Sequence, residues 1–96
     1  MLVSRKIKVG KKYVLGLCLK LSSKSLIVLS GQKGYVMCGY LNLAAANKFK
    51  DVAIKISGVS NIKEALKTKV HSATYMAKKI GIHRNQPIKD VLKIIA

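Results

Sequence analysis

The segment with the clearest chemical potential is Cys38-Gly39-Tyr40-Leu41-Asn42, which joins one of only two thiols to a tight glycine corner. Asn42 is suited to cap a helix, because its side-chain oxygen can accept a hydrogen bond from an otherwise unpaired N–H. The alanine-rich run after it favours a helix over residues 43–49. A thiol just before such a helix would feel its positive end, which favours the thiolate. Cys38 is therefore a candidate nucleophile.

The same segment has two further interpretations. A cysteine inside an apolar strand is commonly a small core residue, which gives Cys38 a structural role. The corner from Gly39 to Asn42 could also form a pocket in which backbone N–H groups bind an anionic ligand. A cysteine enzyme normally needs a base beside the thiol, and the two histidines, His71 and His83, lack motif-like context. The three acidic residues, Asp51, Glu64 and Asp90, are better explained as surface or helix-end charges than as a catalytic pair.

The two cysteines, Cys18 and Cys38, have neither a Cys-x-x-Cys spacing nor clustered histidines. No metal site and no cofactor are therefore expected. Without a secretory context both thiols are expected to be reduced, and a disulfide between them would require their strands to be neighbours.

The charge is strongly one-sided, with 19 basic residues against three acidic ones and a net charge of +16. Such a field attracts nucleic acids and other polyanions, so lysine-mediated nucleic-acid binding is a further candidate function. Its candidate residues are Lys6, Lys8, Lys11, Lys12, Lys33 and Lys48. A solvated lysine-rich surface, as in many thermophile proteins, would give the same composition.

Ninety-six residues are enough for one domain with its own core, and we expect a single domain over residues 1–96. Half of the residues are apolar, which is more than a small monomer easily buries, so a homo-oligomer is expected. The sequence contains no apolar run of membrane-spanning length and no recognisable signal peptide. A cytoplasmic protein without a membrane segment is therefore expected.

Hydrophobic alternation predicts strands in the first half of the chain, over residues 6–9, 13–21, 25–29 and 35–40, separated by short glycine- or serine-containing turns. In the second of them, Tyr13, Leu15, Leu17, Leu19 and Leu21 share one face, while Val14, Gly16, Cys18 and Lys20 share the other. One of these two faces should be buried in the core.

The second half predicts a strand over residues 52–56, parallel to the strand over 35–40 because a helix connects them. Asn61 and Glu64 have the spacing of a capping box for a short helix through Leu66. A further helix is expected over residues 72–80, and a last one begins with Pro87 at its first position. The fold class is therefore α+β, with a mostly antiparallel or mixed sheet of about five strands and three to four flanking helices.

Several blocks of the sequence resemble the YunC-type domain of unknown function found in bacteria and archaea. They cover roughly residues 25–95 and comprise Lys33-Gly34-Tyr35-Val36-Met37-Cys38-Gly39, Leu41-Asn42, Asn47-Lys48, Gly58-Val59-Ser60-Asn61-Ile62, Ala73-Thr74-Tyr75-Met76-Ala77 and Ile80-Gly81-Ile82. The resemblance implies a compact α+β domain and no assigned activity. Asn42 stands where that family usually has aspartate, which removes an acid and leaves the capping role.

Within these blocks we select the residues expected to line a ligand site beside the glycine corner. They are Gly34, Tyr35, Gly39, Asn42, Asn47, Gly58 and Ser60. The leading hypothesis is a ligand-binding or regulatory domain for an anionic ligand, and the alternatives are a cysteine enzyme using Cys38 and nucleic-acid binding.

Overall fold

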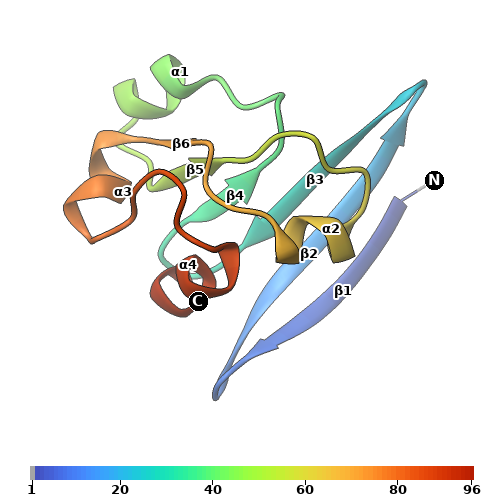
Figure 1. The fold of residues 1–96 in the computed structure, drawn as a ribbon, viewed down its shortest axis with the longest axis horizontal. Helices are drawn as coiled ribbons and strands as arrows, with labels where there is room; N and C mark the ends of the chain where they lie inside the picture. Colours follow the sequence, from blue (N-terminus) through green and yellow to red (C-terminus); the bar gives the residue numbers. More distant parts are fainter. Residues whose placement is uncertain (1) are drawn as a thin grey trace.

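Six strands and four helices form an α+β fold in residues 2–96, the part of the chain that the computed structural model describes (Figure 1). In chain order they are β1 (Leu2–Val9), β2 (Lys12–Leu21), β3 (Lys24–Ser30), β4 (Tyr35–Met37), α1 (Leu43–Lys48), β5 (Ala53–Lys55), α2 (Ile62–Lys67), β6 (Ser72–Ala73), α3 (Tyr75–Lys79) and α4 (Ile88–Ile95). The strands form one sheet in the order β1-β2-β3-β4-β5-β6. The expected α+β class with a mixed sheet is confirmed, with one strand more than expected.

Short turns connect β1 to β4 as an antiparallel meander. Gly10 supplies the left-handed backbone of the first turn, with a φ of +62°, which glycine adopts without a steric penalty. The loop between β3 and β4 closes through a 2.8 Å hydrogen bond from the Gly31 N–H to the Gly34 carbonyl. These turns are where the glycines and serines of the sequence predict them.

Strands β4 and β5 are parallel, with Val36 opposite Ile54, and α1 lies between them in the chain. The Asn42 side chain accepts a 3.1 Å hydrogen bond from the Ala45 N–H, as expected for the N-cap of α1. The expected strand over residues 35–40 is shorter, because the pairing of β4 ends at Met37 and the chain turns at Gly39.

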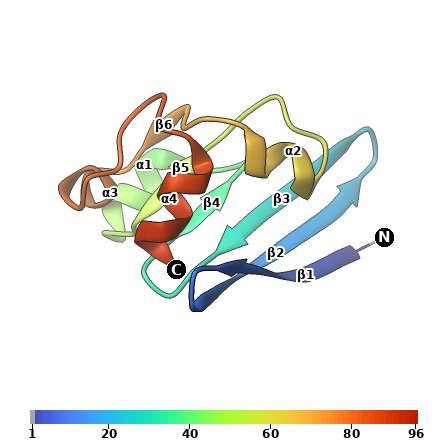
Figure 2. The ribbon, with the colours of Figure 1, turned by 60° about the horizontal axis from the view of Figure 1, so that its bottom comes forward.

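The main core lies between one face of the sheet, here called the inner face, and the helices α2, α3 and α4. Figure 2 shows α2 and α4 lying over the long strands on this side. Helix α4 contributes most to the core because its apolar residues recur at helical spacing. Its four buried side chains are those of Ile88, Val91, Leu92 and Ile95.

The first strand begins earlier than expected, at Leu2 rather than at residue 6, and two helices of the second half begin later than expected. The helix expected over residues 72–80 begins only at Tyr75, because Ser72 and Ala73 pair with β5 as strand β6 and Thr74 becomes the N-cap. Pro87 is the N-cap of α4 rather than its first residue, with an extended ψ of 139°.

The opposite, outer face of the sheet is covered unevenly. Helix α1 packs on its β4–β5 end, where Ala46 and Ala53 are buried together. Over β1–β3 no helix of residues 2–96 lies on this side (Figure 2). The exposed or half-exposed side chains there form a surface that we call the leucine face, made of Tyr13, Leu15, Leu17, Leu19 and Leu21.

The core face of β2 is therefore the one with the smaller side chains. Val14 is completely buried, and Gly16 lies so close to β1 and α2 that an added Cβ would be 2.8 Å from Ile7 Cδ1 and 3.4 Å from Ile62 Cδ1. Small residues on β2 thus make room for Ile7 from β1 and Ile62 from α2, which explains why the large leucines face outward.

Candidate functional site

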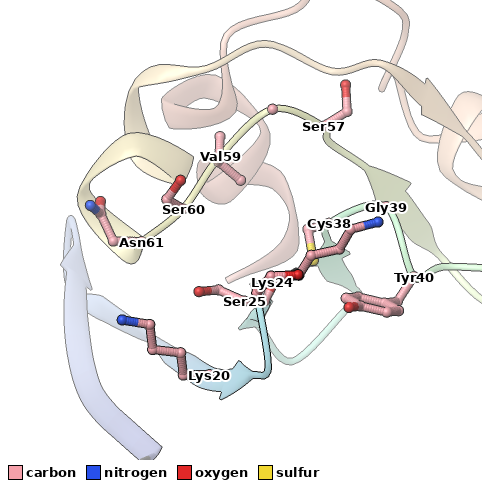
Figure 3. Close-up of a pocket in the computed structure, with 12 residues that line it drawn as sticks. Lys20, Lys24, Ser25, Cys38, Gly39, Tyr40, Ser57, Val59, Ser60 and Asn61 are labelled. Atoms are coloured by element: carbon pink, nitrogen blue, oxygen red, sulfur yellow. Dashed lines mark hydrogen bonds between the residues drawn. The ribbon is translucent and has the colours of Figure 1, made fainter.

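An open cavity of about 840 Å³ lies between the inner face of the sheet and the loop that follows β5 (Figure 3). Three segments line it: residues 20 and 23–25 at the β2–β3 hairpin end, residues 38–40 after β4, and residues 57–61 after β5. Because β4 and β5 are parallel, the segments following them emerge at the same edge of the sheet. Ligands commonly bind at the carboxyl ends of parallel strands.

Cys38 lies in the wall of this cavity but is only 5% exposed. Its Sγ accepts a 3.3 Å hydrogen bond from the Ile27 N–H and donates one of 3.4 Å to the Ser25 carbonyl. Both contacts are with the backbone of β3, so the thiol continues the pairing of the sheet through a side chain. This geometry favours the structural role of Cys38.

The two histidines of the chain do not line this cavity. His71 Nδ1 lies 3.0 Å from Ser72 Oγ, and His83 Nδ1 lies 3.3 Å from the Arg84 carbonyl oxygen. Neither histidine is therefore among the residues that line the cavity beside the thiol. Within residues 2–96, no three His, Cys, Asp or Glu side chains cluster closely enough to hold a metal ion.

The polar groups of the cavity are cationic or neutral. Lys20 and Lys24 supply ammonium groups, and hydroxyls come from Ser23, Ser25, Ser57, Ser60 and Tyr40. None of the lining residues carries a carboxylate. The nearest acid in sequence, Glu64, accepts a 2.7 Å hydrogen bond from the Ser60 N–H and completes the capping box with Asn61. The cavity therefore has the character of an anion-binding site.

Gly39 faces open space, as does Gly58, which also lines the cavity. A Cβ at Gly39 would meet no heavy atom within 4 Å, and its backbone is not left-handed. At Gly34, by contrast, a Cβ would be 2.6 Å from Val52 Cγ1. The fold therefore leaves room for a side chain at position 39, and the glycine keeps that part of the cavity open.

The predicted ligand-binding residues do not all come together. Gly39, Gly58 and Ser60 line the cavity with Cys38, whereas Asn42 caps α1. Asn47 Oδ1 accepts a 2.8 Å hydrogen bond from the Tyr75 N–H and so joins α1 to the start of α3.

Gly34 and Tyr35 lie at the other end of β4, beside a smaller hollow of about 370 Å³. The Tyr35 hydroxyl donates a 3.0 Å hydrogen bond to Asp51 Oδ2. Burial raises the pKa of the Tyr35 phenol, and the hydrogen bond to the Asp51 carboxylate and its negative charge raise that pKa further.

Four of the six candidate nucleic-acid-binding lysines, Lys6, Lys8, Lys11 and Lys12, lie on the β1–β2 hairpin and are exposed. Lys33 is in the β3–β4 loop and Lys48 ends α1, so these two are separate from the hairpin group. Nucleic-acid binding through these lysines stays a prediction.

Sequence reasoning missed several lining residues, including Lys20, Lys24, Tyr40 and Ser57. One signal was present: along the inner face of β2, the run of small or apolar residues ends in Lys20, a charge on the side that faces the core. A lysine at such a position indicates that the core stops there and that water or a ligand begins.

No helix in residues 2–96 is both long enough and apolar enough to cross a membrane.

Three comparisons with known proteins find a family model, a relative in sequence and a similar solved structure. The sequence profile of the domain of unknown function DUF1805 matches residues 37–95. The uncharacterized protein YunC of Bacillus subtilis (strain 168) is 36% identical over 67 residues, an alignment that spans 66% of this chain and 66%, just under two thirds, of that protein. A crystal structure of a protein of unknown function from Thermoplasma acidophilum superimposes with a TM-score of 0.95 at 32% identity, covering 100% of this chain and 94% of that one. The chain therefore belongs to the DUF1805 family of YunC-like domains, whose function is unknown.

Proposed function

We propose that this chain is a ligand-binding or regulatory domain that recognises a small anionic ligand in the cavity beside Gly39. One observation carries the proposal: the cavity combines two lysines and several hydroxyls, and no residue lining it carries a carboxylate. Its volume of about 840 Å³ lies in the usual range for small-molecule sites, about 300–1,000 Å³.

The positions of the lysines support recognition of an anion rather than general attraction. Lys20 lies on the inner face of β2, opposite Ser25 in the register, and Lys24 begins β3 opposite Leu21. Both side chains are exposed, and they border the same open cavity at different ends (Figure 3). A hydrogen bond to a charged group contributes about 1.5–3 kcal/mol.

The test is a titration with inorganic phosphate, pyrophosphate and citrate at physiological ionic strength, followed by amide chemical shifts. Shifts are expected at residues 38–40 and 57–61. The double substitution Lys20→Gln and Lys24→Gln should weaken binding by about 10-fold or more, because each lost contact to a charge costs at least 1 kcal/mol.

The matched control is Lys63→Gln with Lys67→Gln, which removes the same charge from the exposed side of α2, away from the cavity lining. This control should bind almost as the wild type does. Equal weakening in both double variants, or shifts scattered over the whole basic surface, would contradict a specific site.

We also propose that the protein works in a reducing compartment such as the cytoplasm, because its two cysteines do not form a disulfide. Cys18 and Cys38 are both free, and they lie on either side of Ile27 of β3. Two strand spacings place their backbones about 10 Å apart. That exceeds the roughly 7 Å limit for a disulfide, so the strands are not the neighbours that such a bond would need.

We also propose self-association through the leucine face. Tyr13 is 55% exposed and Leu15 is 44% exposed, and they lie in a row with three further leucines. An exposed apolar surface of this kind is typical of an interface. Sedimentation should show an oligomer that Leu15→Gln with Leu17→Gln dissociates, whereas Phe49→Gln, a change at another exposed apolar residue, should not dissociate it.

A further inference from the structure

Starting from the proposed anion site, we infer that its ligand is a nucleoside phosphate, which carries a flat ring as well as the phosphate. The cavity is too large for an inorganic anion alone, and its two ends differ in chemistry. Lys20 and Asn61 lie at one end, and Tyr40 and Gly39 lie at the other, toward which the Lys24 side chain extends (Figure 3). A ligand that fills the cavity must therefore match a cation at each end and an aromatic ring at one of them.

Tyr40 is suited to stack on a ring. Tyr40 lines the cavity and is 49% exposed, so its ring is not buried in the core. Gly39 beside it carries no side chain, and the space where a Cβ would lie is open. A planar group could therefore reach the backbone at position 39 while it contacts the tyrosine ring. Stacking of a base on an aromatic side chain is tolerant of sequence because every base has a π-face.

The remaining polar groups suit the part of the ligand between ring and phosphate. Two serine hydroxyls, from Ser25 on the sheet and Ser60 on the β5–α2 loop, line the cavity between its ends, and Ser57 of the same loop lines it beyond Gly39 (Figure 3). Hydroxyls both donate and accept hydrogen bonds, as the hydroxyls of a sugar require. Phosphate oxygens accept hydrogen bonds from a lysine ammonium group, so ring, sugar and phosphate each have matching groups.

The test compares four probes by calorimetry at physiological ionic strength: inorganic phosphate, ribose 5-phosphate, adenosine and AMP. AMP should bind about 5- to 100-fold more tightly than ribose 5-phosphate, the usual range for one stacked base. Adenosine should bind more weakly than AMP because it lacks the phosphate. The nucleoside phosphate could be a free nucleotide or the 5′ end of a nucleic-acid strand, and a 5′-phosphorylated trinucleotide distinguishes the two. Tighter binding of the trinucleotide than of AMP assigns the site to the end of a strand, and binding no tighter than that of AMP assigns it to a free nucleotide.

Substitution of Tyr40 tests the ring directly. Tyr40→Leu should remove the advantage of AMP over ribose 5-phosphate, whereas Tyr40→Phe should keep that advantage. Tyr75→Leu is the control, since Tyr75 is 65% exposed on α3 and does not line the cavity.

If AMP binds no tighter than ribose 5-phosphate, the inferred ring is wrong although the anion site stands. If neither phosphate nor ribose 5-phosphate binds, the proposed function itself fails.

Discussion

Replacement of single glycines by alanine should separate the glycine that the fold requires from the glycine that the cavity requires. Gly31 lies in the β3–β4 loop against the end of α4. A Cβ there would overlap the Ile95 carbonyl oxygen, and it would lie 2.7 Å from the Ile95 carbonyl carbon and 3.1 Å from Ala96 Cα. These atoms belong to the backbone, so no side-chain rotation can relieve the contact, and α4 must move away from the loop.

The loss of stability in Gly31→Ala has two sources, the close contact itself and a hydrogen bond that the movement of α4 would weaken. Overpacking of a close contact costs about 1–3 kcal/mol. The 2.8 Å hydrogen bond from the Lys33 N–H to the Ile95 carbonyl would weaken as well, and such a bond contributes about 0.5–1.5 kcal/mol. Gly31→Ala should therefore lower the free energy of unfolding by about 2–4 kcal/mol. For a domain of this size that is a fall of about 10 °C or more in Tm.

Gly39→Ala is the matched variant. Its Cβ meets open space and its φ is not left-handed, so the folded state is not strained. Reduced freedom of the unfolded chain should leave the stability unchanged or raise it by up to about 1 kcal/mol. Urea and thermal unfolding measure both variants. The assignment of the two glycines is refuted if Gly31→Ala is as stable as the wild type. It is also refuted if Gly39→Ala loses as much free energy of unfolding as Gly31→Ala does.

Three further predictions concern buried or half-buried side chains. Thr74→Val should lower the free energy of unfolding, measured in urea, by about 2–3 kcal/mol, because the fully buried hydroxyl makes three hydrogen bonds with the backbone. An unchanged free energy of unfolding would contradict the structural role of this hydroxyl. The pKa of the Tyr35 phenol is raised in the folded state, so the unfolded state releases the phenol proton at a lower pH than the folded state does. The stability that comes from the hydrogen bond to Asp51 is therefore present below about pH 10 and is lost as the pH rises above it. The stability difference between wild type and Tyr35→Phe should therefore shrink above that pH, and a constant difference would refute the linkage. Cys38 should be alkylated only on unfolding, as mass spectrometry would show, whereas rapid reaction in the native state would restore the catalytic hypothesis.

Local signals in the sequence were sufficient for most of the topology. The turn residues around Gly10 and the loop from Ser30 to Gly34 act within a few residues, so their hairpins were predictable. The caps at Asn42 and Asn61 are equally local. The start of α3 was not predictable in this way, because β6 exists only through its pairing with β5, a contact distant in sequence.

The burial of β2 shows a different limit. Alternation established that Leu15 and Leu17 share a face, but it could not decide whether that face or the opposite one is the core. The larger apolar area of the leucines would predict that their face is buried, whereas the structure buries the face with Val14 and Gly16. The space above Gly16 is occupied by Ile7 of the neighbouring strand β1 and, next to it, by Ile62 on α2. A side chain almost fifty positions away in the chain therefore contributes to which side of the strand is buried.

The cavity and the leucine face lie on opposite sides of the sheet, which makes the two proposals independent. Ser25 and Cys38 belong to the inner side, and Leu15 and Leu17 point outward from β2. Leu15→Gln with Leu17→Gln should therefore change the oligomeric state and leave the affinity for AMP within about two-fold of wild type, because sites without shared contacts behave additively. Calorimetry on the variant, at a concentration where sedimentation shows dissociation, measures this. A large loss of affinity would mean that a second copy of the chain completes the cavity, so the site would then have to be described across the interface.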